Sequence, residues 1–135
     1  DILGFGAREA IVVDDLGKMA PYQGKLDYMI CTIPYAYDVA AYTSVVKPYG
    51  TFTQVGMPVN FETTLNALAL AANRVNFNAS LIGGMRETQE VIDYCADHKI
   101  HPQIEIISAE QINQAWDDVV NRKARYRYVI DPATF

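Results

Sequence analysis

Residues 78–88 have the sequence NASLIGGMRET, which predicts a strand that runs into paired glycines and then into the start of a helix. Because Gly83 and Gly84 carry no Cβ atom, a flat ligand could lie directly against the backbone there. The following helix start would add backbone N–H groups without intrahelical partners and the positive end of the helix dipole. Pockets for a nucleotide or a nicotinamide ring use this combination. The alternative, that the glycine loop is only a tight connection between strand and helix, is equally compatible with the residues.

The composition is that of an ordinary folded domain. The chain has 135 residues, of which 50% are hydrophobic and 20% charged, so it suits one domain or a part of one. Its net charge of −5 argues against nucleic acid as a partner, because phosphate contacts need a basic face. We find no apolar run long enough to cross a bilayer and expect no membrane partner. The cysteines Cys31 and Cys95 make no disulfide framework, which favours a reducing, cytoplasmic location.

Short apolar segments alternate with segments of helical spacing up to residue 98. Strands are predicted at Ala10–Val13 and at residues 26–31, 51–55 and 75–81, and helices at residues 37–46, 65–72 and 85–98. Strands that alternate with helices indicate an α/β fold with a doubly wound parallel sheet. Ligands of such sheets bind beyond the carboxyl ends of the strands, here predicted at Asp14 and at residues 32–34, 56–58 and 80–84.

The pattern changes after Pro102. A strand is predicted at residues 103–107, and Ser108 with Gln111 forms a capping box for the helix that follows. Residues 125–131 then alternate between polar and apolar side chains, as in a half-buried strand. Because this strand–helix–strand tail has no evident place in the preceding sheet, we predict domains at residues 1–101 and 102–135.

Two motifs near the start of the chain allow a functional and a structural interpretation. The Gly4-Phe5-Gly6 motif could belong to a dinucleotide fingerprint, but Glu9 stands where the third glycine is needed and the motif precedes a strand. A helix end is the better interpretation. Asp14 and Asp15 could hold a ribose hydroxyl, or they could cap the turn that follows, which we favour.

The remaining polar candidates favour structural roles. His98 and His101 have a spacing that could suit a metal, but Pro102 separates them from one helix, so a surface pair is preferred. We find no Ser/His/Asp or Cys/His grouping that offers a nucleophile. A basic cluster near the end of the chain is interpreted as a solvated strand edge, with an anion contact as the alternative; its members are Arg122, Lys123, Arg125 and Arg127.

Several motifs occur in a specific order along essentially the whole chain. They are LDYMI with TIP (residues 26–34), YGTFTQVGMP (49–58), SLIGG with ETQE (80–90), IEII with QIN (104–113) and RYRYVID (125–131). In this combination the chain resembles the carboxyl-terminal part of zinc-dependent medium-chain alcohol dehydrogenases, closest to the cinnamyl alcohol dehydrogenase group. Each motif alone is a weak signal, whereas their order is specific.

The resemblance implies a nicotinamide-dependent oxidoreductase that acts on small alcohols and aldehydes. Residues 1–101 would be the later half of a Rossmann-like cofactor domain that lacks its first strands. Residues 102–135 would return to a catalytic domain outside this chain. Strand residues 78–81 would pair with the same strand of a second copy in a homodimer, which would cover an exposed sheet edge.

The resemblance also implies roles for particular residues. Thr32, Val55, Gly56 and Met57 would lie near the nicotinamide and its ribose. Backbone groups of Ser80, Leu81 and Ile82 would face the carboxamide, and Gly83 belongs to the same loop. Arg127 would approach the pyrophosphate, because its planar donors suit phosphate oxygens.

The chain departs from the family in what it lacks. The zinc ligands of the family, two cysteines and a histidine of the amino-terminal half, have no counterparts here. The glycine-rich phosphate loop and the strand after it, which carries the residue that selects NAD or NADP, are also missing. We therefore expect zinc in a full-length enzyme but not on this chain, and NADP(H) over NAD(H) only as the leaning of the family.

Two hypotheses follow. In the first, the chain is part of a longer enzyme, since it starts at Asp1 in the middle of a helical pattern, and it is inactive alone. The apolar stripe around Trp116 should then be poorly buried. In the second, the chain is a non-enzymatic α/β module for dimerisation or nucleotide sensing, with all of its apolar stripes buried internally.

Overall fold

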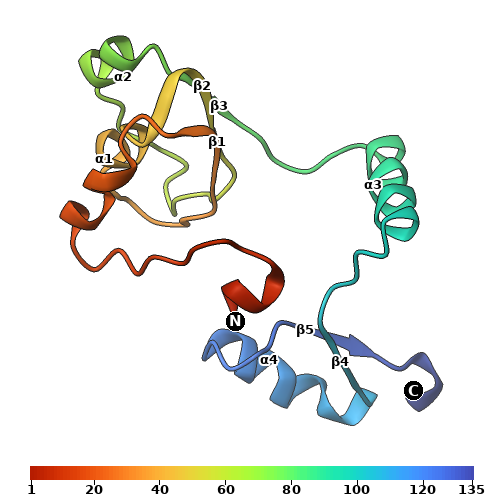
Figure 1. Ribbon diagram of the computed structural model, residues 1–135. Coiled ribbons are helices and arrows are strands. Elements are labelled where there is room, and N and C mark those ends of the chain that lie inside the picture. The colour runs from red at the N-terminus through yellow and green to blue at the C-terminus, as the bar shows by residue number, and fades with distance from the viewer. The chain divides into compact units, whose positions relative to one another are not determined.

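The computed structural model describes residues 1–135 as two units, Asp1–Ile82 and Gly83–Phe135. Each unit contains a parallel sheet of its own, with three strands in the first and two in the second (Figure 1). The predicted α/β class with parallel strands is therefore confirmed. The functional boundary at Pro102 stays a prediction.

The first sheet contains β1 (Leu26–Cys31), β2 (Val46–Gln54) and β3 (Asn76–Ala79), in the order β1-β2-β3. Both pairings are parallel, with Cys31 opposite Gln54 and Gln54 opposite Ala79. These are the last residues of their strands, so the carboxyl ends lie in line at one edge of the sheet. The loops that leave this edge are the ones in which ligands of parallel sheets bind.

The two helices of the first unit begin at capping side chains. Asp38 accepts a hydrogen bond from the Ala41 N–H at 3.2 Å at the start of α1 (Val39–Thr43), and Asn66 accepts one from the Ala69 N–H at 3.0 Å at the start of α2 (Ala67–Asn73). Helix α1 is shorter than the predicted helix 37–46. It ends early because Val46, which has no exposed surface, is the first residue of β2 and part of the core.

The core of the first unit is centred on β2. Phe52 is fully buried and stacks on Phe77 of β3, with ring centroids 5.3 Å apart and planes at 11°. Cys31 and Val46 complete the buried cluster. Cys31 is thus a small residue of the core, whereas Cys95 in the second unit is only partly buried.

Strand β2 begins earlier than the predicted strand 51–55 because it includes an irregularity. The register changes from Leu26 opposite Val46 to Tyr28 opposite Thr51, so extra residues of β2 bulge out of the ladder. Pro48 lies in this bulge, where no ladder hydrogen bond is needed from it. Gly50 is required there, because a Cβ atom would lie 2.7 Å from Val46 Cγ1 and 2.8 Å from the Asp27 carbonyl oxygen.

The prediction of a strand at Ala10–Val13 is wrong. These residues have no regular structure, and no strand of the first sheet pairs with them. A strand needs a neighbouring strand to form hydrogen bonds with, and this segment has none. Its apolar side chains instead line a cavity. Ile11 and Val13 line an apolar cavity of about 360 Å³ together with Met19 and Leu26.

The structural interpretations of the two early motifs are confirmed. Gly6 ends the short 3₁₀ helix η1 (Ile2–Phe5) in the left-handed conformation, with φ 94°. Asp15 caps η2 (Leu16–Tyr22) by accepting a hydrogen bond from the Gly17 N–H at 2.9 Å. Asp14 forms an ion pair with Lys18, and the hydrogen bond from Lys18 lowers the pKa of the Asp14 carboxyl.

The second unit contains the predicted tail. Strands β4 (Ile104–Ile107) and β5 (Arg127–Ile130) pair in parallel, and the helices η3 (Ala109–Gln111) and α4 (Ile112–Val120) connect them. The Gln111 side chain accepts from the Ser108 N–H at 2.9 Å, as expected for a capping box. Helix α3 (Met85–Asp97) precedes this sheet, and η4 (Pro132–Thr134) follows it.

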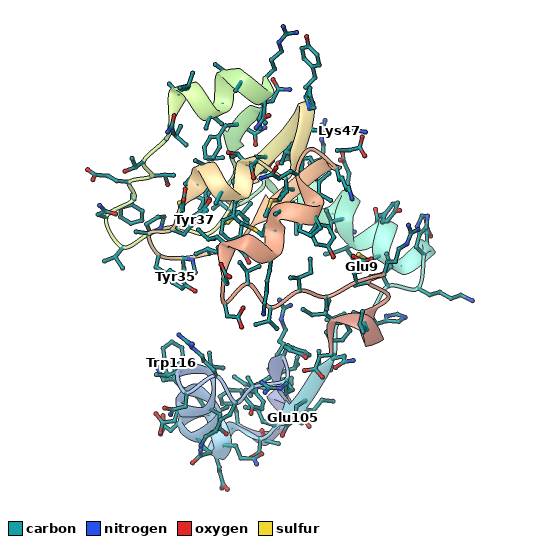
Figure 2. The ribbon with its side chains drawn as sticks, turned by 60° about the vertical axis from the view of Figure 1, so that its left-hand side comes forward. Glu9, Tyr35, Tyr37, Lys47, Glu105 and Trp116 are labelled. Carbon is teal, nitrogen blue, oxygen red and sulfur yellow. The ribbon has the colours of Figure 1, made fainter.

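The apolar stripe of α4 is poorly buried. Trp116, labelled in Figure 2, is 71% exposed, and Val120 is 66% exposed. The first hypothesis predicted this, and the prediction of the second, that all apolar stripes are buried internally, is wrong. None of the helices combines the length and the hydrophobicity that a crossing of a bilayer requires.

Candidate functional site

Three loops leave the carboxyl edge of the first sheet and are held together by main-chain hydrogen bonds. The N–H groups of Val55 and Gly56 both donate to the Cys31 carbonyl oxygen, at 2.9 and 3.1 Å. The Ser80 N–H donates to the Gln54 carbonyl oxygen at 3.0 Å. The ladder thus continues past the strand ends and fixes the first residues of each loop relative to the others.

Gly56 is required by the contact between the loops after β1 and β2. A Cβ atom at this position would lie 2.3 Å from the Ile33 carbonyl oxygen and 2.5 Å from the carbonyl carbon of Thr32. Both are backbone atoms, so neither can rotate away. The absence of a side chain therefore brings Thr32 beside Gly56, and two of the predicted site residues lie together.

Gln54 is a buried polar residue at the end of β2, with only 3% of the residue exposed. Its Nε2 donates to the Gly56 carbonyl oxygen at 2.6 Å and to the Ile33 carbonyl oxygen at 3.3 Å. Its Oε1 accepts a hydrogen bond from the Tyr37 hydroxyl. The amide orientation is thereby determined, because carbonyl oxygens can only accept. All of the hydrogen-bonding capacity that burial would otherwise leave unsatisfied is used.

Tyr37 links this amide to the core. Its ring meets that of Tyr42 edge to face, with centroids 5.2 Å apart. Burial raises the pKa of the Tyr37 phenol, and the neighbouring Cys31 raises it further. The hydroxyl therefore stays protonated and remains a donor to Gln54 at neutral pH.

Gln54 and Tyr37 were not predicted as site residues. The sequence does contain an indication for Gln54, because its amide side chain stands at the end of a predicted buried strand, TFTQV (residues 51–55). A buried amide needs specific partners. Its partners could not be identified, however, because Tyr37 and Ile33 are distant in the sequence and meet only when β1 and β2 pair.

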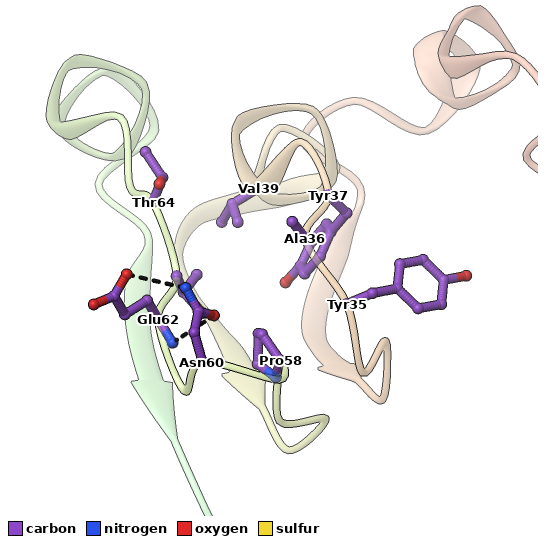
Figure 3. Close-up of a pocket in the computed structure, with 9 residues that line it drawn as sticks. Tyr35, Ala36, Tyr37, Val39, Pro58, Asn60, Glu62 and Thr64 are labelled. Atoms are coloured by element: carbon purple, nitrogen blue, oxygen red, sulfur yellow. Dashed lines mark hydrogen bonds between the residues drawn. The ribbon is translucent and has the colours of Figure 1, made fainter.

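A cavity of about 140 Å³ lies beside this edge. Figure 3 shows Tyr37 on the loop after β1 turned toward Pro58 and Asn60 on the loop after β2, whereas the Tyr35 side chain points away from them. The Asn60 amide donates to the Glu62 carboxylate at 3.0 Å, which holds polar groups at the rim. The cavity therefore combines aromatic and hydrogen-bonding surfaces at the edge where ligands of parallel sheets bind.

The loop after β3 differs in part from expectation. Leu81 and Ile82 are 72% and 90% exposed, but the Ser80 N–H is already used by Gln54. The predicted helix start is present at α3, yet the Gly84 N–H is not unpaired, because it donates to the Glu87 carboxylate at 2.8 Å. The expectation of free N–H groups is wrong at this residue, since a side chain of the helix itself caps it.

The remaining predicted residues belong to the second unit, and their part in a common site stays a prediction. Gly83 lies next to Glu87, whose Oε2 would be 3.2 Å from a Cβ atom at Gly83. Arg127 is the first residue of β5, opposite Ile104. It borders an apolar groove that Trp116 and Val119 of α4 also line.

The side chains that could bind a metal ion do not gather in one place. No three His, Cys, Asp or Glu side chains gather as a metal site would require. His98 stacks on Tyr94, and its Nδ1 lies 2.9 Å from the Tyr94 carbonyl oxygen. The residues present therefore do not fit a zinc ion.

Comparison with known proteins identifies the family. The family described as zinc-binding dehydrogenase matches residues 5–130. The chain belongs to the zinc-binding dehydrogenases. The resemblance deduced from the ordered motifs is thereby confirmed.

Curated zinc-binding dehydrogenase relatives align with nearly the whole chain. The probable formaldehyde dehydrogenase AdhA of Bacillus subtilis is 34% identical over 134 residues, which cover 99% of this chain and 38% of the relative. The NADP-dependent alcohol dehydrogenase C 1 of Mycolicibacterium smegmatis is 36% identical over 134 residues, again 99% of this chain and 38% of the relative. The chain thus spans little more than a third of the length of these relatives.

Solved dehydrogenase structures share the fold. The cinnamyl alcohol dehydrogenase SbCAD4 from Sorghum bicolor superposes with a TM-score of 0.85 at 26% identity, over 95% of this chain and 36% of that one. The structure of CAD from Helicobacter pylori, solved with NADP(H), gives a TM-score of 0.67 at 37% identity, over 81% of this chain and 32% of that one.

Proposed function

We propose that this chain is the cofactor-binding part of an NADP(H)-dependent alcohol dehydrogenase or aldehyde reductase of the zinc type. The observation that carries the proposal is the convergence of three loops at the carboxyl edge of one parallel sheet, beside a cavity with aromatic and polar walls. Family membership and the NADP(H) in the names of two relatives support the choice of cofactor.

The residues of the first unit would bind the nicotinamide half of the cofactor. Thr32, Val55, Gly56 and Met57 start the two loops that close on each other, and they would contact the nicotinamide and its ribose. Backbone groups of Ser80, Leu81 and Ile82 would face the carboxamide, apart from the Ser80 N–H, which already donates to the Gln54 carbonyl oxygen.

The second unit would contribute charge and loop backbone. Arg127 would contact the pyrophosphate, because a guanidinium presents planar donors that match phosphate oxygens. Gly83 would let the backbone of the loop after β3 approach the ring. When bound, the nicotinamide would supply a hydride acceptor or donor for a small alcohol or aldehyde.

The proposed architecture extends beyond this chain. Residues 1–101 would be the later half of the cofactor domain, and residues 102–135 would return to a catalytic domain that holds zinc. The exposed stripe around Trp116 supports such a contact. Strand β3 is an edge of its sheet, which supports pairing of residues 78–81 with a second copy in a homodimer.

Saturation-transfer NMR with NADPH tests the proposal directly. We expect stronger transfer to the nicotinamide protons than to the adenine protons, because the residues present would face the nicotinamide. Met57→Ser should reduce this transfer. Val59→Ser, in the same loop and 94% exposed, is the matched control and should not. Absence of transfer to the nicotinamide protons of NADPH would refute the proposal.

An activity assay tests the prediction that the chain is inactive alone. The chain offers no three-donor metal grouping, so we expect no aldehyde reduction with NADPH and added zinc. Turnover at an ordinary enzyme rate of about 10 per second would contradict this expectation.

A further inference from the structure

We propose that Gln54 is a positioning residue that, together with Tyr37, sets the separation of the two loops forming the cavity at the carboxyl edge. The inference rests on the proposed function in one respect, namely that these loops hold the nicotinamide half of the cofactor. How firmly Gln54 holds the two loops together can be measured by amide exchange without any ligand.

The geometry of the Gln54 side chain carries the inference. One amide group joins two loops, because Nε2 donates to the Ile33 carbonyl oxygen in the loop after β1 and to the Gly56 carbonyl oxygen in the loop after β2. Its Oε1 accepts from Tyr37, which lies further along the first loop. A single side chain therefore connects both loops at their base, where they leave the sheet.

The two loops connected in this way are the two walls of the cavity. Tyr35 and Tyr37 come from the first loop, and Pro58 and Asn60 come from the second (Figure 3). Because Tyr37 both lines the cavity and donates to Gln54, its ring cannot turn away without breaking a buried hydrogen bond. The width between the walls thus depends on the amide beneath them.

Burial makes this arrangement sensitive to substitution. Gln54 is 3% exposed, so water cannot readily replace a lost partner. Replacement by methionine keeps the length and the flexibility of the side chain but removes all of its hydrogen bonds. The carbonyl groups of Ile33 and Gly56 would then lose their amide donor, and the loops would open more often.

Hydrogen exchange in the protein without cofactor tests the fastening. We expect Gln54→Met to accelerate exchange of the Val55 and Gly56 N–H groups about tenfold, since each lost hydrogen bond lowers the cost of local opening. Tyr37→Phe removes only the hydroxyl donor and should give a smaller acceleration at the same amides. It also keeps the test decisive if the Gln54 variant does not fold.

Tyr42→Phe is the matched control. It removes a hydroxyl from the same aromatic pair without removing a partner of Gln54. Exchange at Val55 and Gly56 should stay at the wild-type rate in this variant. Wild-type rates in both Gln54→Met and Tyr37→Phe would overturn the inference, whether or not the protein binds NADPH.

NADPH titration supplies the second readout. If the wild type binds, Gln54→Met should raise the Kd of NADPH about tenfold, whereas the control Tyr42→Phe should keep both the wild-type Kd and the wild-type unfolding midpoint. An unchanged Kd despite faster exchange would overturn the positioning role. If the wild type does not bind, the proposed function fails, and the exchange data alone decide whether Gln54 fastens the loops.

Discussion

Substitution of Gly56 by alanine gives a direct measure of the contact between the loops after β1 and β2. The added Cβ would lie 2.3 Å from the Ile33 oxygen and 2.5 Å from the Thr32 carbonyl carbon. Carbon atoms in contact normally lie about 3.5–4.0 Å apart, so the overlap is about 1 Å or more. The atoms that it meets belong to the backbone, and the loops must separate to admit it.

The expected cost is at the upper end of the range for overpacking, about 3 kcal/mol. Gly4→Ala is the matched control, because a Cβ atom there meets nothing within 4 Å, and its effect should stay below about 0.5 kcal/mol. Native-state amide exchange of β1 and β2 measures both effects within the first unit. In the Gly56 variant, NADPH should also bind more weakly.

The outcome that would refute this reasoning is specific. If Gly56→Ala changes the opening free energy of β1 and β2 no more than Gly4→Ala does, the two loops are not packed as closely as the structure indicates. The closeness of Thr32 to Gly56 would then not depend on the missing side chain at position 56.

Three further predictions concern the cap of α3, the pH dependence of stability and the exposed stripe of α4. Glu87→Ala should destabilise the first turn of α3 by about 1 kcal/mol, because the Gly84 N–H loses its partner, and amide exchange in that turn measures the loss. The pKa of Tyr37 is higher in the folded protein than in the unfolded protein, so the protonated hydroxyl contributes stability that is complete below about pH 10. This contribution is lost as the pH rises through the pKa of the folded protein. Urea midpoints should therefore fall less steeply above pH 10 in Tyr37→Phe than in the wild type. Trp116→Ala should cost less than about 1 kcal/mol in α4, whereas Phe52→Ala, in the fully buried core, should cost about 3–5 kcal/mol in β2 when each is measured by amide exchange.

Each of these predictions has its own control and contrary result. Glu90→Ala removes another glutamate of α3 that does not contact Gly84, and equal exchange in both variants would contradict the capping role. Tyr35→Phe, whose side chain is 60% exposed, should leave the alkaline stability unchanged, and a Tyr37→Phe curve parallel to wild type would contradict the linkage. A loss at Trp116 as large as that at Phe52 would show that the stripe is packed.

Much of the fold was predictable because local signals agreed with long-range ones. The apolar run Leu26–Cys31 was predicted with its observed bounds, and the helix at Met85 was predicted to within a residue of its end. Ser108 with Gln111 located the start of the helical connection in the tail, since capping depends on a spacing that the sequence contains. The prediction failed at Ala10–Val13, where an apolar run has no strand to pair with.

The sequence by itself determined the family, the parallel α/β class and the order of the strands and α-helices from Leu26 onward, because hydrophobic period, caps and ordered motifs are local properties of the chain. Only the tertiary structure decided which side chains fasten the candidate site. Gln54 meets Ile33 and Tyr37 only after β1 and β2 pair in register, and the crowding that requires Gly56 arises from the same pairing. Contacts between residues distant in the chain depend on this register, which no single segment specifies.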